Sequence, residues 1–524
     1  MNKLSYEPSW PDNMLFVGAG ASLPLGFSTT DNLGNMISSL VEEEELSTEE
    51  CVNKAIKDHS EEIKKEWVDL LNMLDSRNQD KRAERERLGI SEERYNELCS
   101  IYDWRALKAL VRLCPKVEGM LKLQDLFNLI DLSISANQGV FVGDDFVRPE
   151  QLHPARNMLI LLITMIHKME YDQAVKNNKE TYQQFYQFSL VLGELMWEEG
   201  LDLAKEHSLN TRDFYLFSYS VVSMNWDPMI LWFLFNAHYK LNNPSSAPGV
   251  GNPPQKMKLF HDLAHFMGVR SIDTPTLSLW YPMNETAVQR LNDPEHQTGR
   301  RVRIGKFYFP HGSHGFRECP YCGKLTFYLG DQWKVLSDDL FPPSIIPSLG
   351  YTDKAKSAGE EKAYGSLGKF DMIQCIYCGA ETEAQHTPLV MQTNYKGQHP
   401  PYIEEIQRDM NVAVSEAKHI ILFGYSLPSD DVHYRSVLTA KKKKGVKCSI
   451  VNFDPDGEDR WLDGEELEAF LKDHPSSGCT DVGESAIELF GRKNVRAYLK
   501  GIPNVFMENG AVSKEKVKKM LRYE

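Results

Sequence analysis

The stretch MLFVGAGAS, residues 14–22, decides how the chain is expected to fold. Its leading apolar residues predict a short buried strand, and the small residues after them predict a tight turn. A helix is expected next, because Thr29, Thr30 and Asp31 offer oxygens that can cap a helix N-terminus. A strand, a glycine turn and a helix in this order are typical of nucleotide-binding α/β proteins, since amides at a helix start attract phosphate. The alternative is an ordinary tight turn of an α/β fold.

The final third of the chain repeats this alternation of strands and helices. Apolar strands are predicted at 419–423 and 447–453, and helices at 403–417 and 431–444. Alternating apolar strands and helices are typical of proteins with a parallel sheet covered by helices on both faces. The sequence therefore predicts an α/β protein with a doubly wound parallel sheet.

Polar side chains follow two further predicted strands in the middle of the chain. Asn225 and Asp227 come after the strand at 219–224, and His311 comes after the strand at 306–309. Ligands of open α/β sheets bind at the carboxyl ends of the strands, so these residues are candidates for function. Each also has a plainer interpretation, because an Asn at a strand end is often a turn former and a lone His is often structural.

Four of the nine cysteines form two CxxC pairs, each followed by Gly. The pairs are Cys319 with Cys322, and Cys375 with Cys378. Two such pairs supply four thiolates for a tetrahedral Zn²⁺. Four thiolates leave no open position on the metal, so the predicted zinc site is structural rather than catalytic.

The composition excludes several classes of protein. A net charge of −15 over 524 residues disfavours a broad nucleic-acid or anionic-membrane surface, and no strong nucleic-acid signal is present. No apolar run is long enough to span a bilayer, so no membrane association is expected. The first residues lack the pattern of a signal peptide. With CxxC pairs that indicate metal rather than disulfides, a reducing, cytoplasmic location is expected.

The chain is expected to divide at its large helical block. Residues 42–210 are predicted to be helical, without a convincing strand, and form an insertion or a second domain. The expected organisation is a first part of the nucleotide-binding core at 1–45, a helical insertion at 46–210, a continuation of the core at 211–316, a zinc module at 317–380 and a last part of the core at 381–524.

The order of these motifs resembles the sirtuin (silent-information-regulator-like) family. The motifs are GAGAS at 18–22, SMNWD at 223–227, HGS at 311–313, the two CxxC pairs, GYSLP at 424–428 and VN at 451–452. The resemblance implies a Rossmann-like domain that binds NAD⁺, with an inserted zinc module. The segment AKHIILFGYSLPSDD, residues 417–431, is similar to bacterial sirtuin-like proteins of antiphage defence, which typically hydrolyse NAD⁺.

The resemblance also implies a role for individual residues. His311 matches the general base of the family, and Asn225 and Asp227 match the polar pair beside the nicotinamide ribose. The residues that match the nucleotide-binding positions are Gly18, Ala19, Gly20 and Ser22 in the phosphate loop, Gly424 and Ser426 in a second loop, and Asn452 near the adenosine ribose.

Two departures favour hydrolysis over protein deacylation. The stretch GFSTT, residues 26–30, lacks the Arg that deacylating sirtuins carry after the glycine loop, and residues 388–392 do not resemble their acyl-lysine-binding strand. The resemblance therefore implies an NAD⁺ glycohydrolase. The alternatives are an NAD-dependent protein deacylase and a non-catalytic subunit that binds NAD or ADP-ribose. Because NAD⁺ loss is toxic, a defence enzyme is expected to form a homo-oligomer and to await a separately encoded partner or sensor.

Overall fold

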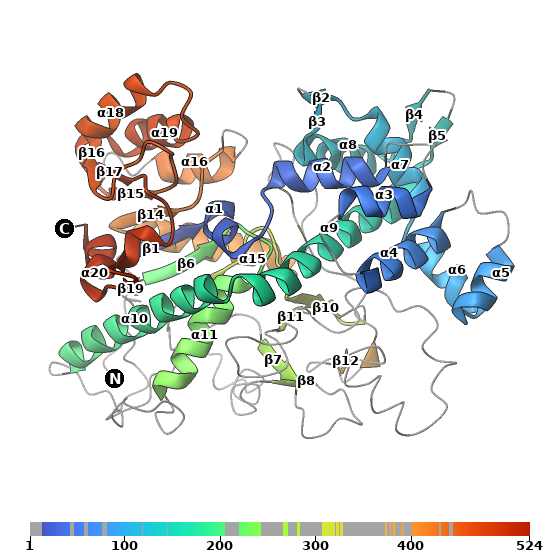
Figure 1. The fold of residues 1–524 in the computed structure, drawn as a ribbon, viewed down its shortest axis with the longest axis horizontal. Coiled ribbons are helices and arrows are strands. Elements are labelled where there is room, and N and C mark those ends of the chain that lie inside the picture. Colours follow the sequence, from blue (N-terminus) through green and yellow to red (C-terminus); the bar gives the residue numbers. More distant parts are fainter. Residues whose placement is uncertain are drawn as a thin grey trace, which may run out of the picture.

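The three-dimensional structure is a computed structural model, shown in Figure 1. It describes residues 13–41, 47–56, 61–75, 81–117, 119–143, 145–204, 219–242, 266–270, 280–282, 307–319, 321–323, 325–328, 373–374, 378, 381–382, 389, 391, 401–428, 431–439 and 444–523.

The centre of the protein is a seven-stranded, mostly parallel sheet, which confirms the predicted α/β class with a parallel sheet. Only the edge strand β16 runs antiparallel to its neighbour. The order across the sheet is β16 (Trp461–Asp463), β17 (Val495–Tyr498), β15 (Lys447–Val451), β14 (His419–Phe423), β1 (Asn13–Val17), β6 (Tyr219–Ser223) and β9 (Phe307–Tyr308).

The chain builds the sheet outward from β1 in two directions. From β1 it passes to β6 and then to β9 on one side, and it returns to β14, β15 and β17 on the other. In register, Val17 lies beside Phe423 of β14 and Ser223 of β6. The direction of winding therefore reverses between β1 and β14, and ligands of open parallel sheets bind outside the carboxyl ends of the strands at such a point.

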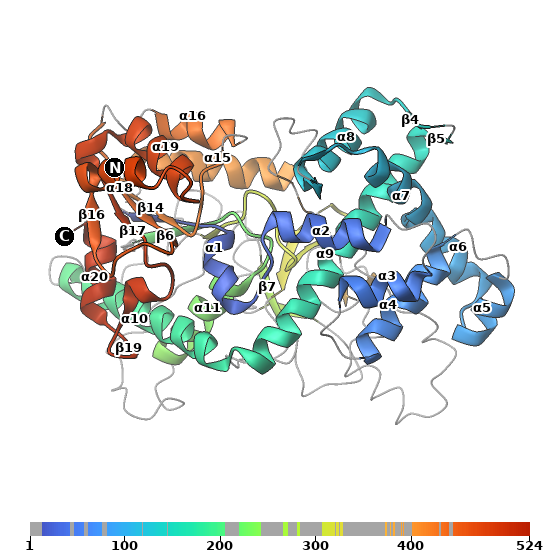
Figure 2. The ribbon, with the colours of Figure 1, turned by 45° about the horizontal axis from the view of Figure 1, so that its top comes forward.

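Helices cover both faces of this sheet, as Figures 1 and 2 show. On one face, α10 (Lys179–Ala204) packs against α11 (Met229–Asn242). The other face carries α15 (Pro401–Glu416), α16 (Val432–Thr439) and α19 (Thr480–Phe490). Strands and helices bury their apolar side chains in one continuous core. The five strands predicted at 14–17, 219–224, 306–309, 419–423 and 447–453 are all present, within one or two residues.

The helical block forms a second hydrophobic core beside the sheet. Its helices are α2 (Thr30–Val41), α3 (Thr48–Ala55), α4 (Glu61–Leu74), α5 (Lys81–Leu88), α6 (Glu92–Ile101), α7 (Trp104–Leu113), α8 (Leu123–Ala136) and α9 (Pro149–Asn177). The expectation that this block holds no strand was wrong. It contains two small hairpins, β2 (Lys116–Val117) with β3 (Met120–Leu121), and β4 (Val140–Val142) with β5 (Asp145–Val147). Strands of two or three residues are too short to show an alternating pattern.

The two cores do not follow the expected ends of the insertion. Leu33 and Ile37 of α2 pack in the second core, although they precede residue 46. Tyr182 and Phe188 of α10 pack in the core around the sheet, although they precede residue 211. The long helices α9 and α10 follow each other and connect the two cores (Figure 1). The domain boundaries themselves stay predictions.

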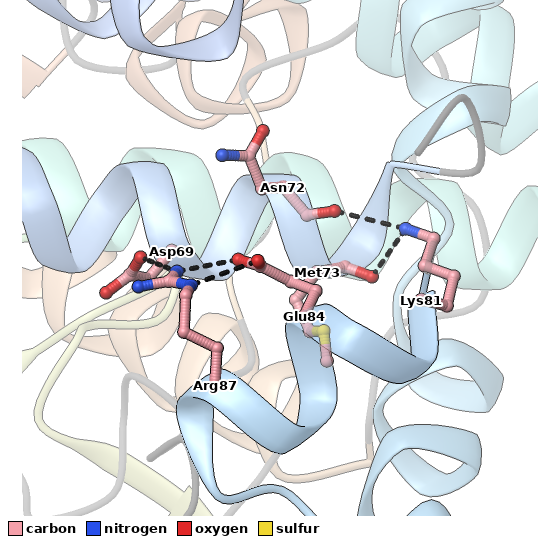
Figure 3. A network of polar contacts seen from close by, with 6 residues as sticks. All are labelled: Asp69, Asn72, Met73, Lys81, Glu84 and Arg87. Carbon is pink, nitrogen blue, oxygen red and sulfur yellow. Dashed lines mark hydrogen bonds and ion pairs between the residues drawn. The ribbon is translucent and has the colours of Figure 1, made fainter. Parts of the chain in front are cut away.

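Polar contacts fasten α5 to the end of α4 within the helical block (Figure 3). The Lys81 ammonium donates to the Met73 carbonyl at 3.0 Å, where the end of α4 leaves carbonyls without helical partners. Arg87 pairs with Glu84 at 2.6 Å and also with Asp69 on α4. Exposed ion pairs of this kind contribute below about 1 kcal/mol each, so they orient α5 more than they stabilise the fold.

Among the described residues, no helix combines the length and apolarity needed to cross a membrane.

Candidate active site

The two glycine loops lie against each other at the carboxyl ends of β1 and β14. The Gly18 amide donates to the Phe423 carbonyl at 3.0 Å, and the Gly20 amide donates to the Gly424 carbonyl at 2.9 Å. A Cβ atom at Gly18 would lie 2.5 Å from the Gly424 oxygen, and Gly424 has a φ of +64°. Glycine is therefore required because the two backbones approach closely and one of them is left-handed.

A cluster of polar side chains joins the ends of β1 and β6. Ser22 ends the short helix α1 (Ala19–Ser22), and its hydroxyl donates to Asp227 Oδ2 at 2.8 Å. The Asn225 amide donates to the Gly18 carbonyl at 2.9 Å and to Ser22 Oγ at 3.0 Å. Asp227 Oδ1 accepts from the Met229 amide at 3.0 Å, at the start of α11. These bonds hold Ser22, Asn225 and Asp227 as one unit, called here the Ser22–Asn225–Asp227 cluster.

The carboxyl group of this cluster is buried. Asp227 is only 5% exposed, and burial raises the pKa of its carboxyl above the ordinary value. The hydrogen bonds from Ser22, Met229 and Asn225 act in the opposite direction, because they favour the charged form. The cluster thus places a hydrogen-bonded acid in a site of low polarity, which is typical of functional carboxyl groups.

His311 reaches the same place from the end of β9. Its ring is buried, its Nδ1 lies 3.4 Å from the Met224 carbonyl oxygen, and its ring centroid lies 5.5 Å from that of Tyr434. The turn that carries His311 is anchored to the segment before Asp227, because Ser313 Oγ donates to the Trp226 carbonyl at 2.9 Å. The structure therefore brings His311 and Asn225 close to Ser22, although the whole helical block separates Ser22 from them in the sequence.

A pocket opens between these groups. It contains about 530 Å³ of space between protein atoms, including open solvent at its mouth. Ser22, Asn225, Asp227 and His311 line it, and so does Ala19 of the first glycine loop. A concave site in which a few polar groups converge is typical of small-molecule binding. The pocket is therefore the candidate active site, and it lies at the carboxyl ends of β1, β6 and β9.

The remaining predicted nucleotide residues share this edge of the sheet but do not line the pocket. Gly20 and Gly424 lie at the contact between the two loops. Ser426 is exposed just beyond β14. Asn452 directly follows β15, and its Oδ1 accepts from the Phe453 amide at 3.0 Å. They extend the candidate site from the pocket toward β15.

The helical block contributes two polar residues that were not predicted. His167 lines the pocket from α9, and burial lowers its pKa to about 4. Glu170 follows three residues later on the same face of α9. Its Oε2 accepts from the Ser28 amide at 3.1 Å, and burial raises its pKa to about 7. The one available signal was weak: His167 is one of three polar residues, with Thr164 and Lys168, in the mainly apolar run 158–169.

Three of the four predicted zinc ligands lie close together. The sulfurs of Cys319, Cys322 and Cys378 are all within 4.8 Å of one another, and those of Cys319 and Cys378 are 3.7 Å apart. A tetrahedral site with metal–sulfur bonds of about 2.3 Å places its sulfurs roughly 3.8 Å apart. The three thiols could therefore bind one metal ion. Cys375 lies outside the described residues.

Comparison with known proteins adds no name to this site. No family model matches the chain, and no curated protein matches its sequence. What the site can do therefore follows from its own side chains. It offers a buried carboxyl group on Asp227, an amide on Asn225 with its nitrogen already bonded, and the imidazoles of His311 and His167. These groups suit proton transfer and the stabilisation of a positive charge.

Proposed function

We propose that the protein is a sirtuin-like NAD⁺ glycohydrolase that cleaves NAD⁺ with water to nicotinamide and ADP-ribose. One observation carries the proposal: Asn225, Asp227 and His311 line a single pocket beside the glycine loop that follows β1. The sirtuin resemblance assigns these same residues to the nicotinamide-ribose half of NAD⁺. Antiphage defence is the setting that the same resemblance suggests.

The strand order supports a dinucleotide as the ligand. Numbered along the chain, the six parallel strands lie in the order 3-2-1-4-5-6 across the sheet. This is the order of Rossmann-like domains, which bind dinucleotides where the order reverses. That position lies between β1 and β14, where the loops of Gly18 and Gly424 meet. The nicotinamide half would then enter the pocket on the β6 side, and the adenosine half would extend toward Asn452.

Each pocket residue would have a distinct task in the reaction. Water forms a bond to the ribose carbon as the bond from that carbon to nicotinamide breaks, and nicotinamide leaves with the electron pair. His311 would accept the proton of the attacking water, a role that suits an imidazole. Asp227 would stabilise the positive charge that develops on the ribose. Asn225 would orient the ribose or the water through its amide oxygen, because Gly18 and Ser22 already hold its nitrogen.

The direct test is to incubate the purified full-length protein with NAD⁺ and to measure nicotinamide and ADP-ribose by chromatography. The active wild type, alone or with its partner added, should form both products in equal amounts. His311→Ala should lose on the order of 10²–10⁴-fold in turnover, the usual contribution of a general base. His153→Ala is the matched control, because His153 is exposed on α9 and should leave turnover unchanged. Undiminished turnover in His311→Ala would refute the assigned base.

The same assay separates the alternatives. Release of an acyl group from an acyl-lysine peptide, dependent on NAD⁺, would favour a deacylase. NAD⁺ binding without turnover, also with the assembled protein, would favour a non-catalytic subunit. We further propose that the active form is a homo-oligomer controlled by a separately encoded partner, since an NADase must be silent until it is triggered. An inert monomer under all conditions, measured by light scattering, would contradict this.

We also infer that the cysteine cluster binds a structural Zn²⁺. The 3.7 Å separation of the Cys319 and Cys378 sulfurs matches a tetrahedral zinc–thiolate site. Cys375 would supply the fourth thiolate. Metal analysis of the wild type should give one zinc per chain, and Cys319→Ser should reduce the zinc content. Cys99→Ser, a cysteine remote from the cluster in sequence, should retain it. Equal zinc content in both variants would refute the site.

A further inference from the structure

A histidine of the helical block faces the candidate active site. His167 lies on α9 and lines the pocket with Asn225 and His311, although its side chain is only 6% exposed. Its ring packs between two aromatic residues, with ring centroids 6.0 Å from Phe27 and 6.4 Å from Trp226. The ring is therefore held in place, and what remains to be settled is which of its nitrogens carries the proton.

A chain of hydrogen bonds settles the position of that proton. Thr164 Oγ1 lies 2.8 Å from the Ile160 carbonyl oxygen, which can only accept, so the threonine hydroxyl donates its one proton there. The contact of 3.3 Å between Thr164 Oγ1 and His314 Nδ1 must then be a donation from the histidine. His314 is thus protonated on Nδ1, and its Nε2 is an acceptor in the neutral ring.

The protonation of His314 determines which nitrogen of His167 carries a proton. Its Nδ1 lies 2.7 Å from His314 Nε2, so His167 must donate from Nδ1. A neutral His167 therefore carries an unprotonated Nε2 with a free lone pair. Burial lowers the pKa values of both rings, and the charge of a protonated His167 would lower the pKa of His314 further. Within the part of the chain that the structure describes, His167 Nε2 has no hydrogen-bond donor from the protein.

We propose that His167 Nε2 is a substrate-binding acceptor, which takes a hydrogen bond from the nicotinamide-riboside half of NAD⁺ in the pocket. The donor is either a ribose hydroxyl or the carboxamide N–H of nicotinamide, because a neutral imidazole nitrogen accepts from both. The identity of the ligand rests on the proposed function. The helical block would then complete the active site, and Thr164 and His314 would be positioning residues that fix the tautomer of His167.

The charge of the ligand explains why a neutral histidine suits this position. The nicotinamide ring of NAD⁺ is positively charged, and the ribose becomes positive as the bond to nicotinamide breaks. A protonated His167 would repel both charges at short range. A neutral acceptor instead recognises a donor without adding positive charge to the pocket. The buried pair with His314 keeps His167 in that state at neutral pH.

The first measurement is the ¹⁵N spectrum of histidine-labelled full-length protein, with His167 assigned through His167→Asn. The expected signal shows a protonated Nδ1 and a bare Nε2 on His167. Thr164→Val removes the acceptor of His314 and should shift the tautomer equilibrium of both rings, whereas Thr164→Ser should preserve it. A protonated Nε2 on His167 in the ligand-free wild type would overturn the inference, whether or not the protein acts on NAD⁺.

The second measurement is the affinity for ADP-ribose and for nicotinamide, by calorimetry. His167→Asn keeps an amide nitrogen near the position of Nδ1 and removes Nε2, whereas His167→Gln can place an amide oxygen near Nε2. We expect roughly tenfold weaker binding in His167→Asn and partial recovery in His167→Gln. A loss seen with ADP-ribose alone identifies the ribose hydroxyl as the donor, and a loss with nicotinamide alone identifies the carboxamide.

The outcomes separate this inference from the proposed function. If the wild type binds ADP-ribose and cleaves NAD⁺ but His167→Asn binds both probes normally, the inference fails and the glycohydrolase stands. If the wild type binds neither probe and does not cleave NAD⁺, the glycohydrolase fails and the assigned ligand of His167 falls with it. A ligand-dependent change in the His167 Nε2 shift, lost in Thr164→Val, would support the complete chain.

Discussion

Two buried histidines at opposite ends of the sheet have the same proton arrangement but different partners. His419 opens β14, and its Nδ1 donates to the Leu521 carbonyl at 2.9 Å, while Ser449 Oγ lies 2.8 Å from its Nε2. His167 at the other end donates from Nδ1 to His314. Burial lowers both pKa values to about 4. The two rings therefore differ in their surroundings: Nε2 of His419 lies beside a serine, whereas His167 lines the pocket.

The amino end of the sheet shows what a closed polar cluster looks like. Arg496 Nε donates to Ser449 Oγ at 2.9 Å, so the serine proton is available for His419. The Arg496 guanidinium lies 4.2 Å from the Trp461 ring centroid and 4.4 Å from that of Tyr523. The C-terminal helix α20 (Lys514–Arg522) covers this cluster. His419, Ser449 and Arg496 bind one another and other protein groups, which indicates a structural role, whereas the carboxyl end of the sheet has a pocket with space for a ligand.

The largest expected effect is a loss of activity at the carboxyl end of the sheet, where the comparison places the functional site. Asn225→Ala should reduce NAD⁺ turnover on the order of 10²–10³-fold, because an oriented polar group at the reacting centre is lost. The free energy of unfolding should fall by only about 1–2 kcal/mol, the usual cost of losing the hydrogen bonds to Gly18 and Ser22. Steady-state rates and thermal unfolding of the same sample provide the check, with the exposed Asn32→Ala as control. A loss of stability equal to the loss of activity would make Asn225 structural.

Acid titration tests the histidines at both ends. Each has a pKa lowered from 6.5 to about 4, so the unfolded chain binds a proton before the folded chain does. The stability that each ring contributes is therefore complete above pH 6.5 and falls as the pH drops toward 4, by up to about 3 kcal/mol per ring. Denaturant unfolding measured between pH 6.5 and pH 4 should show the free energy of unfolding falling with pH.

Variants of the two histidines show how much each one contributes to this pH dependence of stability. His419→Gln and His167→Asn should each remove one part of it, and ADP-ribose should affect only the part that depends on His167. An unchanged slope in both variants would show that other groups control acid stability.

Arg496→Ala should give the next largest effect, on stability alone. It removes hydrogen bonds to Ser449 and Met520 and the stacking with Trp461, which together are worth about 2 kcal/mol. The free energy of unfolding should fall by this amount, and NAD⁺ turnover per folded molecule should stay unchanged. Arg492→Ala, on an exposed helix end, is the matched control. If fully folded Arg496→Ala showed reduced turnover, the cluster at the amino end of the sheet would contribute to activity as well as to stability.

The smallest effect is expected at the surface of α20. Lys514 pairs with Glu198 of α10 at 2.5 Å, but the side chains are 33% and 53% exposed. Lys514→Ala should lower the free energy of unfolding by less than about 1 kcal/mol, because water and salt screen such pairs. Urea unfolding at low and high salt is the measurement. A larger loss than that of Arg496→Ala would mean that surface charge, rather than the buried cluster, holds α20.

The sequence predicted much of the sheet and one side of the pocket. Apolar runs marked β1, β6, β14 and β15, because a buried parallel strand needs apolar side chains on both faces. Glycines marked the turns where the two loops meet. Asn225, Asp227 and His311 could be expected at one edge, since parallel strands present their carboxyl ends together. The bound ligand and the reaction stay predictions.

His167 and Glu170 could not have been predicted in this way. They lie on α9, whose apolar residues are buried on nearly every side, so its sequence pattern does not reveal which face meets the pocket. The match of His314 Nε2 with His167 Nδ1 depends on two segments that only the packing of α9 against the sheet brings together.

Local patterns therefore determined the strands, the glycine turns and the edge of the sheet where Asn225, Asp227 and His311 gather. These features follow from side-chain periodicity and backbone conformation within a few residues. The tertiary structure alone decided which helix lines the pocket with a histidine and which nitrogen of His167 contacts His314. That choice depends on contacts between distant segments, for which the sequence carries no local signal.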